Sequence, residues 1–257
     1  MDGRAGASLR KLEFQVADKA VAGVLVELHN RSLSGAGLCV VGTLAYMAWL
    51  NELGARAVAA RTQDIDLAAR QRLRLAAPQS FFDAVQTSRL DFVRVPGLSR
   101  AAPSTSLKMP GRDGLRVDLL THGLKAGAAV PVPALLWHAQ AVPHYDHLLD
   151  RPRPAAVLAG GHCIPVLLPQ PQRLLWHKLY SSASRRGFPE KADKDVVQAA
   201  TLAAVMVELE DEPLADSFRD VPPAMKPMLR KRLPALRRAL RAHAGTFEAF
   251  EAALSAG

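Results

Sequence analysis

The chain has 257 residues, of which 49% are hydrophobic, together with two cysteines and a formal net charge of +9. This composition excludes a disordered or fibrous chain and a disulfide scaffold, and the length suffices for one large domain or two smaller ones. Residues 1–12 contain no apolar signal core and no run is long enough to span a membrane, so we expect a cytoplasmic protein. The positive charge favours acidic partners such as nucleotides or nucleic acid.

The first part of the chain combines helical and strand patterns. Apolar residues at helical spacing predict one N-terminal helix over Leu9–Asn30. The apolar run Leu38–Val41 predicts a strand covered on both faces, and Leu44–Leu53 predicts a helix. Gly42 and Thr43 lie between them, where an ordinary tight turn is one interpretation. The other is an anion site, because a helix N-terminus offers free N–H groups and glycine lets a phosphate approach the backbone.

Three aspartates lie in predicted strands. Asp64 and Asp66 are two positions apart, so the period of a strand places both carboxylates on one face. Aspartate is disfavoured in strands, and a divalent cation with oxygen ligands explains the pair better than two solvated side chains do. Asp118 stands among apolar neighbours in Leu115–Leu120, the second strand of a predicted hairpin. Since a lone buried carboxylate is unfavourable, we expect Asp118 to lie beside Asp64 and Asp66.

The middle of the chain gives weaker signals. Prolines flank Ala134–Ala141, for which we predict a short helix. His144 and His147 offer two imidazoles at helical spacing, but no third zinc ligand is near in sequence, so structural histidines are favoured over a zinc site. Residues Ala155–Ala159 and His162–Leu168 predict a second hairpin with glycines at its turn.

The C-terminal part is helical in pattern. From Gln172 onward the apolar spacing predicts a helical domain over residues 169–257, after a sheet domain over residues 1–168. The span Met225–Ala242 carries seven cations without interleaved aromatic residues. Such a segment can follow a nucleic-acid backbone, but a solvated helix face is the favoured interpretation.

Taken together, Val41-Gly42-Thr43, the Asp64 and Asp66 pair and the later Asp118 resemble the signature of the DNA polymerase β-like nucleotidyltransferase superfamily. The chain is most similar to a bacterial nucleotidyltransferase-fold family of unassigned substrate, and more distantly to nucleotidyltransferase-like toxins of abortive-infection systems. The segments that carry the resemblance are Gly42–Tyr46, Thr62–Leu67, Val117–Leu120, His177–Leu179 and Lys194–Asp195.

This resemblance implies an α/β (α+β) fold, with a small mixed β-sheet flanked by helices and followed by a C-terminal helical domain. It implies that Asp64, Asp66 and Asp118 are catalytic and bind Mg2+ or Mn2+. It also implies that Gly42 and Thr43 hold the triphosphate of an NTP such as ATP.

Further nucleotide contacts are implied for Lys178 and Lys194, and we add Arg186 from the basic turn beside them. Without the resemblance, Lys178 is a lysine whose stem covers apolar surface while its ammonium reaches water. The toxin-like relatives carry a second acid one turn after Asp195, whereas Gln198 stands there in this chain, so for Asp195 we expect a salt bridge only.

We therefore expect a metal-dependent transfer of NMP from an NTP to the hydroxyl group of a small molecule, a protein or an RNA, without a membrane partner. Two alternatives stay open. One is a nucleotide-binding regulatory protein of the same fold without turnover. The other is a basic nucleic-acid-binding protein whose aspartates are incidental, which would bind without a divalent ion and weaken steeply with salt.

Overall fold

A computed structural model describes residues 4–70, 72–97, 102–185, 187–209 and 214–255 of the chain. The helices of the described residues are α1 (Arg4–Lys11), α2 (Lys19–Asn30), α3 (Gly42–Glu52), α4 (Phe81–Gln86), the 3-10 helix η1 (Pro133–Leu135), α5 (Tyr145–Leu148), α6 (Pro171–Ser184), α7 (Pro189–Glu208), α8 (Leu214–Arg219), α9 (Lys226–Arg230), α10 (Leu233–Ala239) and α11 (Ala244–Ser255). The strands are β1 (Leu38–Val40), β2 (Asp64–Ala69), β3 (Val93–Arg94), β4 (Ser106–Lys108), β5 (Arg116–His122), β6 (Ala129–Val132), β7 (Trp137–Val142), β8 (Arg153–Ala159) and β9 (His162–Leu168).

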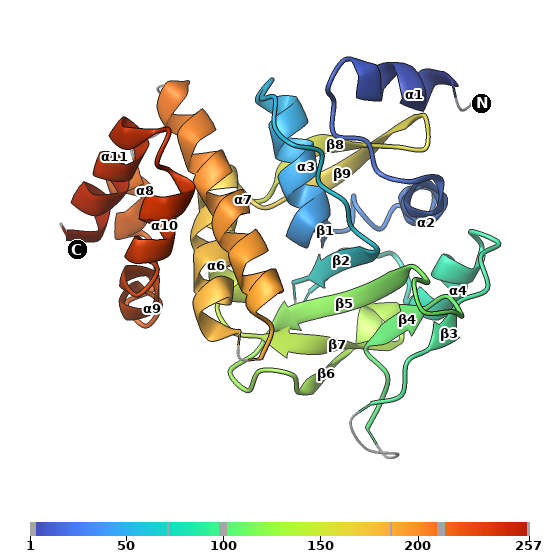
Figure 1. Cartoon of the computed structure of the whole chain (residues 1–257). Helices are drawn as coiled ribbons and strands as arrows, with labels where there is room; N and C mark the ends of the chain where they lie inside the picture. The colour runs from blue at the N-terminus through green and yellow to red at the C-terminus, as the bar shows by residue number, and fades with distance from the viewer. Residues whose placement is uncertain (1–3, 71, 98–101, 186, 210–213, 256–257) are drawn as a thin grey trace. The chain divides into compact units, whose positions relative to one another are not determined.

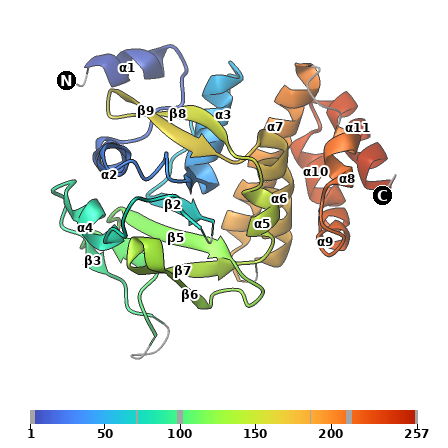
Figure 2. The ribbon, with the colours of Figure 1, turned by 180° about the vertical axis from the view of Figure 1, so that it is seen from behind.

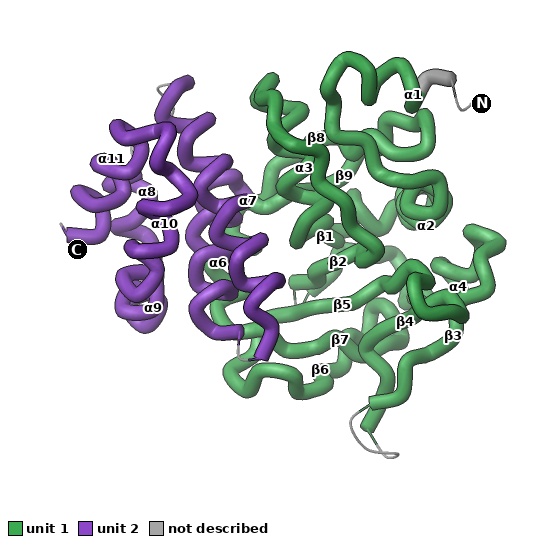
Figure 3. Tube along the Cα trace, in the orientation of Figure 1, with its two compact units in different colours: residues 1–169 green, residues 170–257 purple. Residues whose placement is uncertain are grey.

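The chain forms two compact units, residues 1–169 and residues 170–257 (Figure 3). The first unit contains a mixed sheet with helices beside it, and the second contains only helices within its described residues. The predicted α+β fold is confirmed. No described helix is both long and apolar enough to cross a membrane.

The sheet of the first unit runs in the order β3-β4-β5-β2-β1-β9-β8, and β7 extends it by pairing with β5 and β6 (Figures 1 and 2). Strand β2 is central because it pairs with β1 on one side and with β5 on the other. The pairing of β2 with β1 is antiparallel, whereas its pairing with β5 is parallel. Both predicted hairpins, β4–β5 and β8–β9, are present with antiparallel pairing.

Helix α3 is enclosed on nearly all sides. Every residue from Thr43 to Leu50 is buried, and the helix contacts β2 and the β8–β9 hairpin. Strand β1, which precedes it, is buried at all three positions, as the apolar run predicted. A helix without a polar face is stable only when other elements cover it. The surrounding elements therefore fix the start of α3, which includes Gly42, against the sheet.

The single N-terminal helix predicted over residues 9–30 is wrong. The chain leaves the helical conformation after α1, where Glu13 has a φ of 66°, and α2 starts only at Lys19. Between the helices, the side chain of Asn51 accepts a hydrogen bond from the Gln15 N–H and donates one to the Gln15 carbonyl, each at 2.8 Å. These tertiary hydrogen bonds hold an extended segment where apolar spacing alone indicated a continuous helix.

The short helix predicted over Ala134–Ala141 is also wrong. Only Pro133–Leu135 forms a helical turn, and Leu136 has a φ of 45° that ends it. Strand β7 follows, with strictly alternating buried and half-buried residues, and pairs parallel to β5. The flanking prolines mark the ends of this strand, and they would mark the ends of a helix equally well. They therefore could not distinguish a strand from a helix here.

The second unit packs around Trp176 of α6. The Trp176 ring lies 5.2 Å from that of Phe218 and 5.4 Å from that of Phe250, between ring centroids. Its indole N–H donates to the Ser217 hydroxyl at 2.9 Å, which satisfies the one polar atom of this buried side chain. Helices α6, α8 and α11 thus share one aromatic core.

Candidate functional site

The parallel pairing of β2 with β5 brings carboxylates together on one face of the sheet. Asp66 is the register partner of Asp118, and neighbouring strands lie about 4.8 Å apart. Asp64 lies two positions along the same face, opposite Arg116. Ile65 and Leu67, between and after the two β2 aspartates, point into the core with exposed fractions of 0% and 1%. The period of two therefore places all three aspartates on the face opposite the core side chains of β2.

Gly42 meets this face at the start of α3. Its φ is +66°, and a Cβ atom at this position would overlap the Asp66 carboxylate and lie 2.9 Å from Asp66 Cγ. The Val41 N–H donates to the Asp66 carbonyl at 2.9 Å, so the backbones are also joined here. Only glycine allows this close approach. The first N–H groups of a helix have no partner within the helix and form its positive end, and this end lies beside Asp66.

Asp118 is held by two residues that we did not predict. Arg116 Nε donates to both Asp118 oxygens, at 2.7 Å and 3.0 Å, and the Ser106 hydroxyl donates to Asp118 Oδ1. Arg116 Nη2 also donates to Ser106 Oγ at 2.8 Å, which closes the network. The exposed fractions of the Arg116 and Asp118 side chains are 37% and 18%. The charge of Asp118 is thus compensated by a guanidinium group.

A signal for this network exists in the sequence. Arg116 stands two positions before Asp118 and therefore shares its strand face. Ser106 is the cross-strand partner of Asp118 in the predicted hairpin. The pairing register had to be known before Ser106 could be assigned.

The donor types on this face fit a divalent cation, because Mg2+ and Mn2+ prefer carboxylate oxygens. Asp66 and Asp118 are adjacent, and the Asp64 carboxylate makes no hydrogen bond or ion pair within the described residues. The side chains are not yet gathered: among the described residues, no three His, Cys, Asp or Glu side chains converge as a metal site would require. A cation held by all three aspartates would therefore require their side chains to move closer together.

Within the described residues, His144, His147 and Cys39 belong to no group of three or more side chains that could hold a metal ion. His144 has a φ of 62° and precedes α5, whereas His147 is a buried residue within it. Cys39 lies in β1 without exposure, and burial raises the pKa of its thiol to about 12. A thiol with this pKa stays protonated and is a poor nucleophile.

In the second unit, Lys178 takes part in a buried ion pair. Lys178 Nζ lies 3.4 Å from Asp195 Oδ1, and the two side chains are 6% and 11% exposed. Arg185 Nε donates to the other Asp195 oxygen at 2.9 Å. The interpretation of Lys178 as a lysine whose ammonium reaches water is wrong, and the salt bridge expected for Asp195 is present. Lys194 is exposed on α7, and Arg186 lies outside the described residues.

Several cations of the basic segment, residues 225–242, serve the packing of the second unit. Arg230 Nε donates to the Leu254 carbonyl at 3.0 Å, and Arg232 donates to the Ser182 carbonyl, each in the last turn of a helix. Cations stabilise helix C-termini because the exposed carbonyls carry partial negative charge. Arg237 lies 3.7 Å from Glu251. Lys231, Arg238 and Arg241 of this segment are exposed and form neither an ion pair nor a hydrogen bond to a carbonyl within the described residues.

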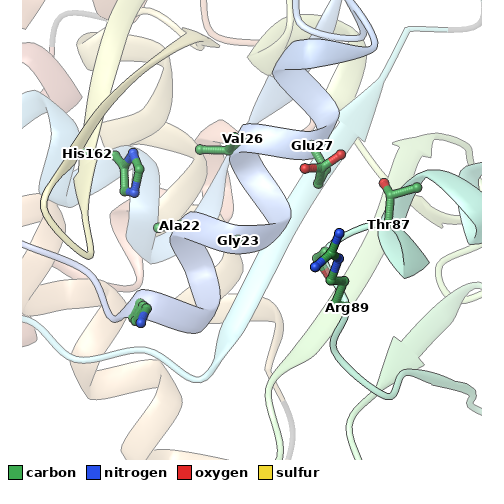
Figure 4. Close-up of a pocket in the computed structure, with 9 residues that line it drawn as sticks. Ala22, Gly23, Val26, Glu27, Thr87, Arg89 and His162 are labelled. Carbon is green, nitrogen blue, oxygen red and sulfur yellow. The ribbon is translucent and has the colours of Figure 1, made fainter. Parts of the chain in front are cut away.

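Two of the cavities formed by the described residues lie in the first unit. One, of about 610 Å³, is lined by α2, residues 87–89 and His162 of β9 (Figure 4). The other, of about 580 Å³, is lined by residues 10–18, Met47 and residues in the range 57–62. None of the three aspartates lines either cavity. The second cavity reaches Thr62, whose Oγ1 accepts a hydrogen bond from the Asp64 N–H at 3.2 Å.

The buried ion pair generates a stability prediction. Lys178→Met should lower the free energy of unfolding by about 2 kcal/mol, because buried Asp195 keeps its charge and loses one of its two cationic partners, while Arg185 stays in place. Lys191→Met, an exposed lysine of α7, is the matched control and should change stability little. Adding Asp195→Asn to Lys178→Met should recover part of the loss. Urea denaturation of the full chain measures all three. Equal stability of the two single variants would contradict the ion pair.

No curated protein matches the sequence. A family model described as Nucleotidyltransferase matches residues 19–222, which include β2, β5, Gly42 and the three aspartates. Because this match covers well over half of the chain, the protein belongs to this nucleotidyltransferase family.

Proposed function

We propose that the protein transfers NMP from an NTP to an acceptor hydroxyl group, with the reaction centre on the face of β2 and β5. The observation that supports this most is the register of Asp66 with Asp118 beside Gly42 at the start of α3, inside the segment that matches the family. Carboxylates next to a helix N-terminus combine a place for a cation with a place for a phosphate chain.

The roles follow from the chemistry of phosphoryl transfer. Gly42 and Thr43 would hold the terminal phosphates through backbone N–H groups and the Thr43 hydroxyl. Asp64, Asp66 and Asp118 would hold Mg2+ or Mn2+, which supplies charge neutralisation on the phosphate oxygens when bound. Asp118 would also accept the proton of the acceptor hydroxyl. The new O–P bond forms at the α-phosphorus as the bond to the β-phosphate breaks, so pyrophosphate leaves in line.

Residues of the second unit are also proposed to contact the nucleotide. Lys194 and Arg186 remain proposed nucleotide ligands. Lys178 also remains a proposed nucleotide ligand, and this proposal rests on the resemblance alone. In the structure its ammonium group forms an ion pair with Asp195 of the same unit. A cytoplasmic location and an acceptor of small-molecule, protein or RNA type are proposals as well.

The acceptor class can be identified directly. Purified protein is incubated with each α-labelled NTP, Mg2+ or Mn2+, and either total cell RNA or a cell lysate. Transfer of label to RNA, to protein or to a small molecule identifies the acceptor class. Absence of labelled product in every combination would support the regulatory alternative, a nucleotide-binding protein without turnover.

The site itself is tested with Asp66→Asn. This change removes one of three neighbouring like charges at constant volume, so the variant should be as stable as the parent without ligand. The rise in melting temperature given by Mg2+ plus a non-hydrolysable NTP analogue should disappear, because ligand stabilisation follows binding to the native state. Thermal denaturation measures both quantities. Asp113→Asn, an exposed residue of the β4–β5 turn, is the charge-matched control.

A persistent ligand-induced rise in Asp66→Asn would exclude Asp66 from the cation site. Strong destabilisation without ligand would instead identify Asp66 as a structural carboxylate whose hydrogen bonds the fold requires.

The basic segment tests the nucleic-acid alternative. Replacing Lys231, Arg238 and Arg241 with glutamine should reduce RNA affinity and its salt dependence if these exposed cations contact phosphates, and should leave NTP affinity unchanged. Filter binding at two salt concentrations measures the effect. A control in which Arg230 and Arg232 are replaced should lose stability, since both donate to helix carbonyls. Loss of NTP affinity in the first variant would place the nucleotide at the basic segment.

A further inference from the structure

We propose that Arg116 makes metal binding depend on the nucleotide, by occupying the Asp118 carboxylate until a triphosphate arrives. This inference rests on the proposed function, and it assigns a positioning role to a residue outside the predicted site. Without nucleotide, Arg116 acts through Asp118, the carboxylate that it engages.

Asp118 accepts three side-chain hydrogen bonds, which engage both of its carboxylate oxygens. Oδ1 accepts from Arg116 Nε at 2.7 Å and also from the Ser106 hydroxyl, while Oδ2 accepts from the same Nε at 3.0 Å. The Ser106 oxygen is itself engaged, because it accepts from Arg116 Nη2 at 2.8 Å. Both carboxylate oxygens are therefore directed toward the guanidinium group. A cation shared by Asp118 and Asp66 needs at least one of them.

The charges on this face determine how strongly a cation can bind there. Asp64, Asp66 and Asp118 contribute three negative charges, and Arg116 forms the only ion pair with Asp118 among the described residues. Lys108 is the register partner of Arg116, but its ammonium donates to the Arg112 carbonyl at 3.3 Å. A divalent cation that arrives alone must displace Arg116 from its partner or bind beside another positive charge. Both alternatives weaken its binding.

A bound triphosphate changes the charge around Arg116. Its oxygens offer the guanidinium group a new anionic partner, and Arg forms bidentate hydrogen bonds with phosphate as readily as with carboxylate. Arg116 can then leave Asp118 without losing its charge compensation. Its side chain is 37% exposed, so it has room to move. Metal and nucleotide consequently bind with positive coupling, and by linkage each raises the affinity for the other.

The test measures Mn2+ binding to the purified full chain, by the electron paramagnetic resonance signal of free Mn2+, with and without a non-hydrolysable NTP analogue. Arg116→Met should raise the affinity for Mn2+ without nucleotide by about tenfold, the scale of one hydrogen bond to a charged group. The factor by which the analogue strengthens Mn2+ binding should fall correspondingly. Arg112→Met, an exposed arginine of the same hairpin, removes the same charge and should change neither quantity.

Ser106→Ala provides a second variant in case Arg116→Met does not fold. It removes the hydroxyl that joins Arg116 to Asp118, and it should raise the nucleotide-free Mn2+ affinity by a smaller factor than Arg116→Met. Suppose that the analogue promotes Mn2+ binding to the parent, but the folded variants bind Mn2+ without nucleotide no more tightly than the parent does. This result would overturn the role of Arg116. If the parent binds no Mn2+ even with the analogue, the proposed metal site fails as well.

Discussion

The register between β2 and β5 is the constraint on which the rest of the site depends. A parallel pairing that aligns Asp66 with Asp118 brings two like charges to neighbouring strands, with Asp64 two positions away. Like charges this close destabilise a fold unless something compensates them. The fold compensates them locally. Arg116 and Ser106 engage Asp118, and the positive end of α3 lies beside Asp66.

The same register divides the two strands into a chemical face and a core face. Ile65 and Val117 are paired and fully buried, so a shift of one residue would bury aspartates and expose the core. Hydrophobic burial therefore specifies the position of the carboxylates more strongly than any contact among the carboxylates does. The enclosed helix α3 adds the third element, because Gly42 is held at one place against β2.

Period-two alternation and turn residues sufficed to predict β2, both hairpins and the shared face of Asp64 and Asp66. Local patterns failed where distant residues decide. Asn51 holds Gln15 in an extended segment within the predicted N-terminal helix. Ser106 became recognisable as a partner of Asp118 only through the strand register. No local sequence pattern indicates whether Lys178 forms a buried ion pair with Asp195 or extends its ammonium group into water.

The β2–β5 pairing also bears on how the chain folds. Asp66 and Asp118 are about fifty residues apart, and contacts of such separation form slowly because the intervening chain must first lose its freedom. The backbone hydrogen bonds of helices join residues close in sequence and can form early. The carboxylate pair is therefore among the later features to assemble. The return of ligand binding during refolding consequently reports the pairing of β2 with β5 in the central sheet, and not the formation of helices.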